Sequence, residues 1–359
     1  MQILKEYRGV LVTAVVALAV GVASYAVVSR DPYAASTNQL FNFDVSRLYE
    51  IDPHLIRFAQ TTEINVDLEE VRSISVGPAD KVYVAGDQAV HVFSADGRAL
   101  TVIETEGRPS CLAIGTDRHF APGQIYVGAG NRIEVFTSDG NPVAIWNLPD
   151  ANTILASIAV TPRDIFVADA GNRVVLRYDQ TGQLVGKIGD PTLNGRTFNV
   201  PSSYFDVAVS TTGLLHVTNP GALRIETYNM DGEMELRWGQ AGPSISDFFG
   251  CCNPSHFAVL PNGGFVTSEK GVPRVKIYSE FGEFEGVVAG PQLLGVAESE
   301  LGDPRALQAK AVFDVATDSQ GRILVLDPRQ RVVRVFCRME PHETEDQGIA
   351  FELQPASRN

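Results

Sequence analysis

The sequence lacks any cluster of lysine and arginine. Its 359 residues include 29 basic and 43 acidic side chains, which gives a formal net charge of −14 at pH 7. A protein that binds nucleic acid normally carries a basic face, and an anionic lipid surface would repel an acidic body. We therefore expect neither nucleic acid nor an anionic lipid surface to be a partner of the folded body.

Local signatures of several enzyme classes are also missing. The sequence has no nucleophile elbow, no phosphate-binding P-loop, no dinucleotide fingerprint and no haem attachment motif of the C-x-x-C-H type. Histidine is scarce, with six residues, and there are four cysteines. Reactive groups must therefore come from positions that are distant in the sequence and that the fold brings together.

What the sequence has instead is an internal repeat. A strand that ends in an aromatic residue recurs six times, at intervals of 42 to 58 residues. These aromatic residues are Phe93, Phe136, Tyr178, Tyr228, Tyr278 and Phe336. Five of them are followed closely by a turn that contains glycine. Short strands with a period of roughly 40–50 residues are the signature of a β-propeller, because one repeat cannot bury its apolar faces without its neighbours.

The sequence predicts four strands in each of the first five repeats. The sixth repeat has only three, because its fourth strand is missing. In the fourth repeat the alternation of apolar residues predicts strands at residues 206–210, 214–218, 224–228 and 233–238. A strand pattern at Thr61–Val66 precedes the first repeat and has no partner there. If it completes the sixth repeat, the ring closes and no sheet edge is left open. We therefore predict an all-β fold, a six-bladed propeller over residues 54–340.

The N-terminus has a different character. Residues 9–28 form a run of twenty residues without a charge, long enough to span a bilayer as a helix. Lys5 and Arg8 precede the run, which predicts that residues 1–30 form a cytoplasmic stub and a transmembrane anchor. The propeller would then lie on the periplasmic or extracellular side, after a linker at residues 31–53. The alternative is a signal peptide cleaved near Ala26. The polar tail at residues 341–359 is expected to be disordered.

The repeats resemble those of the NHL family. The resemblance rests on patterns such as Gly171-Asn172-Arg173-Val174-Val175 and Asp206-Val207-Ala208-Val209, and it extends over residues 61–340. It implies a propeller fold and leaves the function open, since family members include exported lyases, calcium-dependent hydrolases, RNA-binding modules and protein-interaction platforms. The lyases hold a metal with several channel histidines, whereas only His256 is expected at the channel mouth here.

The innermost strand of each blade lines the central channel of a propeller. Counting back from the aromatic residues aligns the first residue of that strand in all six blades. The aligned residues are Ser73, Cys111, Ser157, Asp206, His256 and Asp314. All six are polar, and four are of types that bind metal ions. The alternative is that these side chains only satisfy backbone groups where the strands begin.

The loop that enters the fifth repeat contains two adjacent cysteines. Cys251 and Cys252 precede His256 by five and four residues. One interpretation is a ligand cluster that also includes Cys111, since thiolates with imidazole suit zinc, copper or an iron–sulfur cluster. A second is a vicinal disulfide that stiffens the loop or acts in redox chemistry. The third is that the cysteines are ordinary loop residues.

An arginine recurs at the start of the third strand in five repeats. These residues are Arg132, Arg173, Arg224, Arg274 and Arg331. They are expected on the same face as the channel mouth, where they could form an anion-binding collar, because guanidinium groups match carboxylate and phosphate. The alternative is local pairing with loop carboxylates such as Asp169 or Asp327.

Three functions agree with these patterns. The first is a membrane-anchored, exported module that binds a ligand or another membrane or periplasmic protein through its top face, where long loops are expected at residues 190–205, 239–255 and 290–313. The second is a redox or metal-dependent enzyme, or an electron-transfer accessory subunit, that uses the Cys-Cys-Asn-Pro-Ser-His loop. The third is a hydrolase with calcium on Asp206 and Asp314. The possible metal cofactors are therefore zinc, an iron–sulfur cluster or calcium, and we favour the first function.

Overall fold

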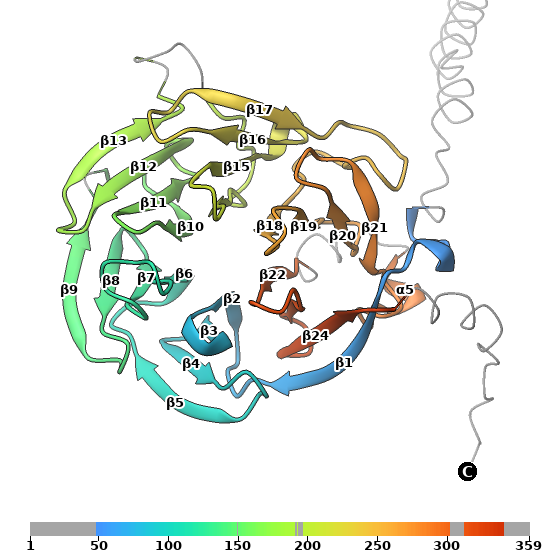
Figure 1. The fold of residues 1–359 in the computed structure, drawn as a ribbon, viewed down its shortest axis with the longest axis horizontal. Helices are drawn as coiled ribbons and strands as arrows, with labels where there is room; N and C mark the ends of the chain where they lie inside the picture. The colour runs from blue at the N-terminus through green and yellow to red at the C-terminus, as the bar shows by residue number, and fades with distance from the viewer. Residues whose placement is uncertain (1–47, 149, 191, 193–196, 302–311, 341–359) are drawn as a thin grey trace, which may run out of the picture. The chain divides into compact units, whose positions relative to one another are not determined.

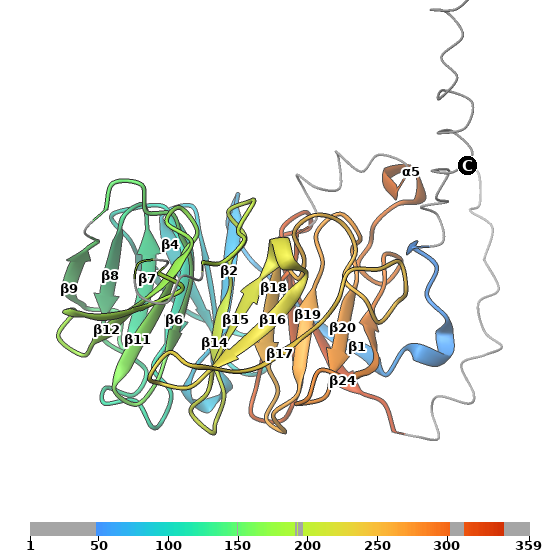
Figure 2. The same ribbon diagram turned by 90° about the horizontal axis from the view of Figure 1, so that it is seen from above.

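The chain folds into a ring of six antiparallel four-stranded sheets (Figure 1). The computed structural model describes residues 48–340, except 149, 191, 193–196 and 302–311. The innermost strands of the six sheets line a central channel with a cavity of about 280 Å³. Figure 2 shows the blades from the side. The predicted all-β, six-bladed propeller is confirmed.

The first three blades follow one another in chain order. Blade 1 consists of β2 (Val71–Val76), β3 (Val82–Gly86), β4 (Ala89–Phe93) and β5 (Ala99–Glu104). Blade 2 consists of β6 (Pro109–Ile114), β7 (Ile125–Ala129), β8 (Arg132–Phe136) and β9 (Pro142–Asn147). Blade 3 consists of β10 (Leu155–Val160), β11 (Asp164–Asp169), β12 (Val174–Asp179) and β13 (Leu184–Ile188).

The last three blades include the one that closes the ring. Blade 4 consists of β14 (Val207–Val209), β15 (Leu215–Asn219), β16 (Arg224–Tyr228) and β17 (Met234–Trp238). Blade 5 consists of β18 (His256–Val259), β19 (Phe265–Ser268), β20 (Val275–Tyr278) and β21 (Phe284–Ala289). Blade 6 consists of β22 (Asp314–Thr317), β23 (Ile323–Asp327), β24 (Val332–Arg338) and β1 (Phe58–Asn65). A short helix, α5 (Glu298–Leu301), lies between blades 5 and 6.

The strand that precedes the first repeat closes the ring, as predicted. β1 pairs antiparallel with β24, in a register that runs from Phe58 opposite Arg338 to Asn65 opposite Val332. The strand begins three residues before the expected start at Thr61. In Figure 1, β1 lies along the outside of β24 and leaves blade 6 with the same four strands as the other blades.

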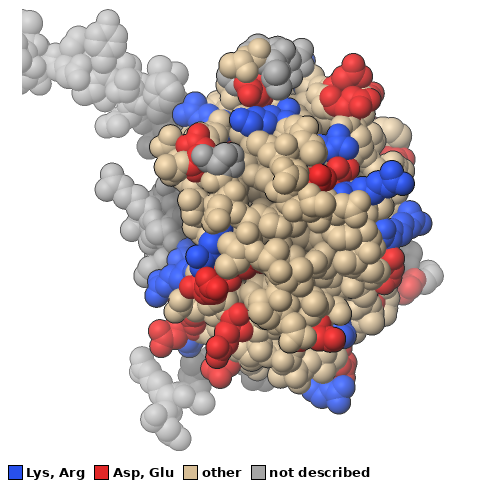
Figure 3. All heavy atoms as spheres, turned by 90° about the vertical axis from the view of Figure 1, so that its left-hand side faces the viewer, with Lys and Arg blue, Asp and Glu red and all other residues tan. Residues whose placement is uncertain are grey.

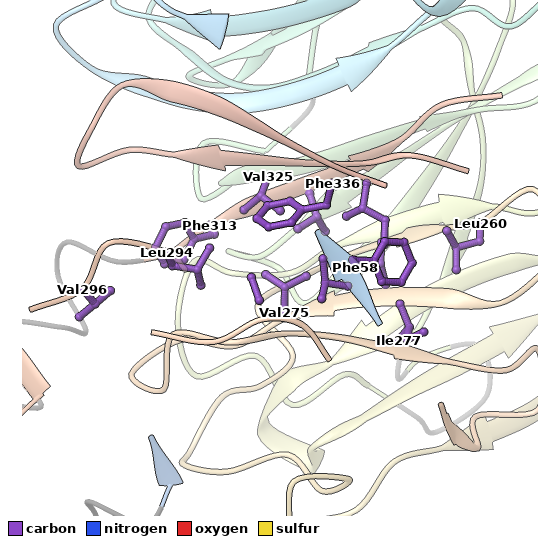
Figure 4. Packing of buried hydrophobic residues seen from close by; sticks show 14 residues of the cluster. Phe58, Leu260, Val275, Ile277, Leu294, Val296, Phe313, Val325 and Phe336 are labelled. Carbon is purple, nitrogen blue, oxygen red and sulfur yellow. The ribbon is translucent and has the colours of Figure 1, made fainter. Parts of the chain in front are cut away.

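The apolar core is divided among the interfaces between blades. Figure 4 shows the cluster between blades 5 and 6, where Phe58 of β1 lies among Val275 and Ile277 of β20 and Phe336 of β24. Phe58 is 2 % exposed and Phe336 is fully buried. The closing strand thus adds a core side chain as well as backbone hydrogen bonds, and burial of one such side chain stabilises a fold by about 1.5–3 kcal/mol.

The glycines of the repeated turns are required for two reasons. Each of the five adopts a positive φ, between 82° and 86°, which costs glycine little and other residues more. Each also faces the outer strand of the preceding blade at close range. The pairs are Gly97 with Ile64, Gly140 with Ile103, Gly182 with Trp146, Gly232 with Ile188 and Gly282 with Trp238. The same turn in each repeat therefore makes the same kind of contact with the preceding blade.

The ends of the chain lie largely outside the described residues. This applies to the predicted membrane anchor at residues 1–30, to the linker as far as residue 47 and to the tail at 341–359. Within the described ranges, no helix has the length and apolar character needed to cross a membrane. Leu48 is 3 % exposed and Tyr49 packs against the cluster between blades 5 and 6. These two residues, which belong to the predicted linker, therefore pack with the folded body.

Candidate functional site

Three of the six aligned channel residues converge on one point. Asp206, His256 and Asp314 belong to blades 4, 5 and 6, and each offers a ligand atom within 4.8 Å of the other two. Ser73, Cys111 and Ser157 hold the same place in blades 1 to 3, since all six oppose equivalent residues of their second strands. The alignment is confirmed, and the acidic and imidazole groups occupy one side of the ring.

The two carboxylates are fixed by backbone groups of neighbouring blades. Asp206 Oδ2 accepts a hydrogen bond of 2.9 Å from the N–H of Phe257 in the next blade. Asp314 Oδ2 accepts one of 2.9 Å from the N–H of Ile74, also in the next blade. The second oxygen of each carboxylate accepts the N–H of the residue that follows it. One role of the two aspartates is therefore to accept hydrogen bonds from backbone N–H groups. These hydrogen bonds also fix the carboxylates in position for a second role.

The second role is a charge contact with His256. Its Nδ1 lies 3.5 Å from Asp206 Oδ2 and 3.4 Å from Asp314 Oδ1. Burial alone would lower the pKa of His256, but the negative charges of Asp314 and Asp206 outweigh burial and the net pKa is raised. Burial raises the pKa of Asp314, and the charge of His256 opposes that shift. Ionised carboxylates at these distances favour the protonated imidazole.

A cavity of about 790 Å³ opens above this cluster on the top face, where the innermost strands begin. His256 lines both this cavity and the channel below it. Tyr204 forms part of the wall, with its ring edge-on to the imidazole at a centroid distance of 5.6 Å. Our sequence analysis missed Tyr204, because it lies in an irregular loop without periodicity. Its position two residues before Asp206 was the available signal.

Cys111 does not join the other candidates. Its side chain is 2 % exposed and packs in the apolar cluster between blades 2 and 3. Burial raises the pKa of Cys111 to about 12. A protonated, enclosed thiol is a poor metal ligand, so the proposed cluster of Cys111 with the adjacent cysteines is not assembled in this structure.

Cys251 and Cys252 form a second group on the loop that enters blade 5. Both are free thiols, with their Sγ atoms 3.2 Å apart. Among the described residues, His256 shares its potential metal site with Asp206 and Asp314 and not with these cysteines. The single Cys-Cys-His cluster considered from the sequence is thus divided into two neighbouring groups.

The arginine series is occupied mainly by local ion pairs. Arg132 contacts Glu134 at 2.9 Å, and Arg274 contacts Glu269 in the interior. Arg224 contacts Glu226 at 2.5 Å. The partners are glutamates, whereas the sequence analysis suggested loop aspartates. Arg173 and Arg331 have positive φ values of 59° and 58°. The anion-binding collar stays a prediction.

The donor set suggests which metals would fit the three-residue cluster. Two carboxylates with one imidazole suit a divalent ion of intermediate character, such as zinc. Calcium takes about six to eight oxygen ligands, and here the third group supplies nitrogen. The cluster is therefore a better match for a transition metal than for the calcium considered from the sequence.

Comparisons with known proteins agree on the fold. No family model matches the chain, and no curated protein matches it either. Among solved structures, a streptogramin B lyase is similar at 14 % identity and a TM-score of 0.51, over 79 % of this chain and 98 % of that chain. Virginiamycin B lyase from Staphylococcus aureus aligns at 13 % identity and 0.51, over 79 % and 100 %.

A third solved structure, a protein of unknown function from Bacteroides thetaiotaomicron, aligns at 12 % identity and a TM-score of 0.54. It covers 78 % of this chain and 75 % of that chain. Likeness at such low identity establishes the propeller fold and does not extend to activity.

Proposed function

We propose that this chain is a binding module that takes up a small polar ligand on its top face and is held outside the cytoplasm by an N-terminal membrane anchor. The observation that carries the proposal is the placement of His256 between two buried carboxylates at the floor of a cavity of about 790 Å³. Cavities of this size suit small organic molecules, and a few fixed polar groups orient the ligand.

The walls of the cavity define the kind of ligand. Basic and acidic side chains both line it, namely Arg72, Arg108, Arg329, Glu69, Glu70 and Asp87. Arg72 contacts Glu70 at 2.6 Å across an exposed surface, where such a pair contributes little to stability. A ligand that carries both hydrogen-bond donors and an anionic group would find partners on these walls.

The same face offers room for a protein partner. The connections between blades 3 and 4, 4 and 5, and 5 and 6 all begin where an outer strand ends, on the face where the innermost strands start. Binding sites are commonly built on such loops over a rigid scaffold. A membrane or periplasmic protein that delivers or receives the ligand is therefore the expected partner.

The test is ligand capture by the full chain. The purified protein is incubated with a small-molecule extract of its host and analysed by native mass spectrometry. We expect a bound mass that is lost in His256→Asn and kept in Arg98→Ala, because Arg98 is exposed in a turn on the opposite face. Equal capture by wild type and His256→Asn would refute the proposal.

A metal-dependent enzyme is the second candidate, and the convergence of Asp206, His256 and Asp314 within 4.8 Å favours it. A bound metal would supply Lewis-acid chemistry, and these three residues would hold it while Tyr204 limits access to the imidazole. Elemental analysis of the purified chain distinguishes the two candidates. One equivalent of metal in the wild type, lost in Asp206→Asn and in Asp314→Asn, would favour the enzyme.

A further inference from the structure

The adjacent cysteines have a setting of their own. Cys251 is exposed to solvent and Cys252 is buried, with the two sulfur atoms 3.2 Å apart. A zinc–sulfur bond is about 2.3 Å long, so a tetrahedral ion would need the two sulfurs at roughly 3.7 Å. The observed separation is shorter than this, and rotation of the exposed Cys251 side chain would widen it. The two sulfurs are therefore close enough for both to bind one small ion.

Lys270 provides positive charge at this pair. Burial acts to raise the pKa of Cys252, but hydrogen bonding and charge from Lys270 help to outweigh it. With a smaller contribution from the Cys251 thiol, the net pKa of Cys252 is lowered. The Lys270 ammonium also lies 5.3 Å from the centre of the Tyr204 ring. A cation thus favours the thiolate form, which is the form that binds metals.

The cysteine loop is fixed by a buried amide. Asn253 is 1 % exposed, and its side-chain amide donates to the carbonyl oxygens of Phe249 at 2.5 Å and Lys270 at 3.0 Å. Its side-chain oxygen accepts the N–H of Lys270 at 2.7 Å. One residue thereby joins the cysteine loop to the connection between β19 and β20, which carries the lysine.

Buried charges hold the preceding part of the same loop. Lys276 is fully buried, and its ammonium donates to the carbonyl oxygens of Ile245 at 3.0 Å and Asp247 at 2.7 Å. Glu269 is also fully buried and accepts the N–H of Phe249 at 3.1 Å. Buried charges are costly unless they are paired, and here Lys276 Nζ lies 3.3 Å from Glu269 Oε2 while both groups also bond backbone groups of the loop. The loop is ordered before any ligand arrives, which lowers the entropic cost of binding.

We infer that Cys251 and Cys252 form a bidentate site for a soft, thiophilic metal ion. The two thiols release two protons, each sulfur forms one bond to the ion, and no group changes its oxidation state. Soft thiolate pairs select ions such as Cu(I) and Zn(II). The site lies outside the His256 cluster, so the inference goes beyond the proposed function.

Accessibility favours a metal ion over thiol–disulfide exchange. In exchange, the thiolate must attack a sulfur of an incoming disulfide. Cys252 carries the Lys270 contact but is only 2 % exposed, whereas Cys251 is exposed and has its pKa raised chiefly by its hydrogen bond with Cys252. A bulky disulfide cannot reach the buried sulfur. A small ion can reach both sulfurs from the Cys251 side.

Cadmium is a suitable probe, because its thiolate complexes absorb in the ultraviolet. The full chain is purified in reductant, exchanged into degassed buffer and titrated with Cd²⁺. We expect a thiolate charge-transfer band that saturates at one Cd²⁺ per cysteine pair, with proton release. Cys251→Ser should lower the affinity at least about tenfold, because one of two linked ligands is lost. Cys337→Ser is the matched control, since Cys337 lies on β24 in the closing blade, and it should leave the titration unchanged.

Further outcomes decide the inference. Cys251 is exposed, so Cys251→Ser should melt as the wild type does, and lost binding then reflects the site and not the fold. His256→Asn should keep Cd²⁺ binding, which separates this site from the cavity above the channel. Equal Cd²⁺ affinity in wild type and Cys251→Ser would overturn the inference. So would an intact mass two hydrogens lighter that persists in mild reductant, because the pair would then be a disulfide.

Discussion

His256 illustrates how much of the site depends on single residues. The repeat alignment placed Asp206, His256 and Asp314 at equivalent positions, so their convergence was predictable once the ring was known. The contact of Tyr204 with the imidazole was not, because an irregular loop positions it. The lowered pKa of Cys252 was equally hidden, since it depends on Lys270, which comes from another loop. Sequence periodicity predicts positions on strands and says little about loop conformation.

The charge contact of His256 predicts a pH dependence. Because its pKa in the folded protein is raised above the ordinary value of 6.5, the stability contributed by the imidazolium is complete below about pH 6.5. It is lost as the pH rises through the folded-state pKa. Asp314→Asn should lower the pKa of His256, since it removes the strongest favourable charge while the amide oxygen can still accept the Ile74 N–H. NMR titration of the imidazole signals measures this shift.

His216 is an internal control in the same titration. Burial lowers its pKa to about 4, and its Nδ1 lies 2.9 Å from the Thr227 hydroxyl. Its midpoint should not respond to Asp314→Asn. An unchanged His256 midpoint in that variant would show that the carboxylate does not set the charge of the imidazole.

The repeated turn glycines give a second prediction at the scale of a residue. Gly182 has a φ of 82°, and an added Cβ would lie 2.6 Å from the Trp146 ring. Gly213 has a φ of 85° but nothing within 4 Å of that point. Gly213→Ala should cost about 1–2 kcal/mol from backbone strain alone. Gly182→Ala should cost about 1–3 kcal/mol more, from overpacking. Urea unfolding measures both, and equal losses would contradict the role of the blade contact.

At the scale of the element, the strands were more predictable than the site. The expected strands of the fourth repeat coincide with β14 to β17 to within one residue at each end. The aromatic residues and turn glycines mark the third strand and the turn that follows it, so the register follows from them. The burial of Leu48 was not predicted, because a single buried leucine has no periodic neighbours.

The closing strand should contribute strongly to stability. Phe58 is 2 % exposed and lies in the cluster between blades 5 and 6. Phe58→Ala should therefore lower the free energy of unfolding by about 3–5 kcal/mol. Phe281 is 68 % exposed, so Phe281→Ala should change it by less than about 0.5 kcal/mol. Denaturant unfolding of the two variants tests the closure, and a Phe58→Ala variant as stable as the wild type would argue against it.

At the scale of the whole molecule, the negative net charge is not concentrated on the outer side of blades 2 and 3. Figure 3 shows this side, where acidic and basic residues are mixed around a broad uncharged area. Val143 and Ile145 of β9 are 53 % and 44 % exposed, and Val185 of β13 is 53 % exposed. The negative net charge of the chain therefore does not prevent this side from contacting an acidic partner.

The predicted anchor gives a test on the full chain. The uncharged run at residues 9–28 should keep the protein in the membrane fraction after a high-salt wash, because salt screens charges and leaves hydrophobic insertion intact. A variant that lacks residues 1–30 should appear in the soluble fraction. Fractionation with immunodetection measures both. Recovery of a soluble wild-type form that begins near Val27 would identify the segment as a cleaved signal peptide.

The pairing of β1 with β24 has a consequence for biogenesis. The Thr61 hydroxyl donates a hydrogen bond to the Val335 carbonyl across 274 residues of sequence. During synthesis from the N-terminus, blades 1 to 5 can stack while the nascent chain is still growing. β1 must wait, with an unpaired edge, until the last strand has emerged. Emergence of β24 thus becomes the event that closes the ring, and in the interval before it the unpaired edge of β1 is open to aggregation.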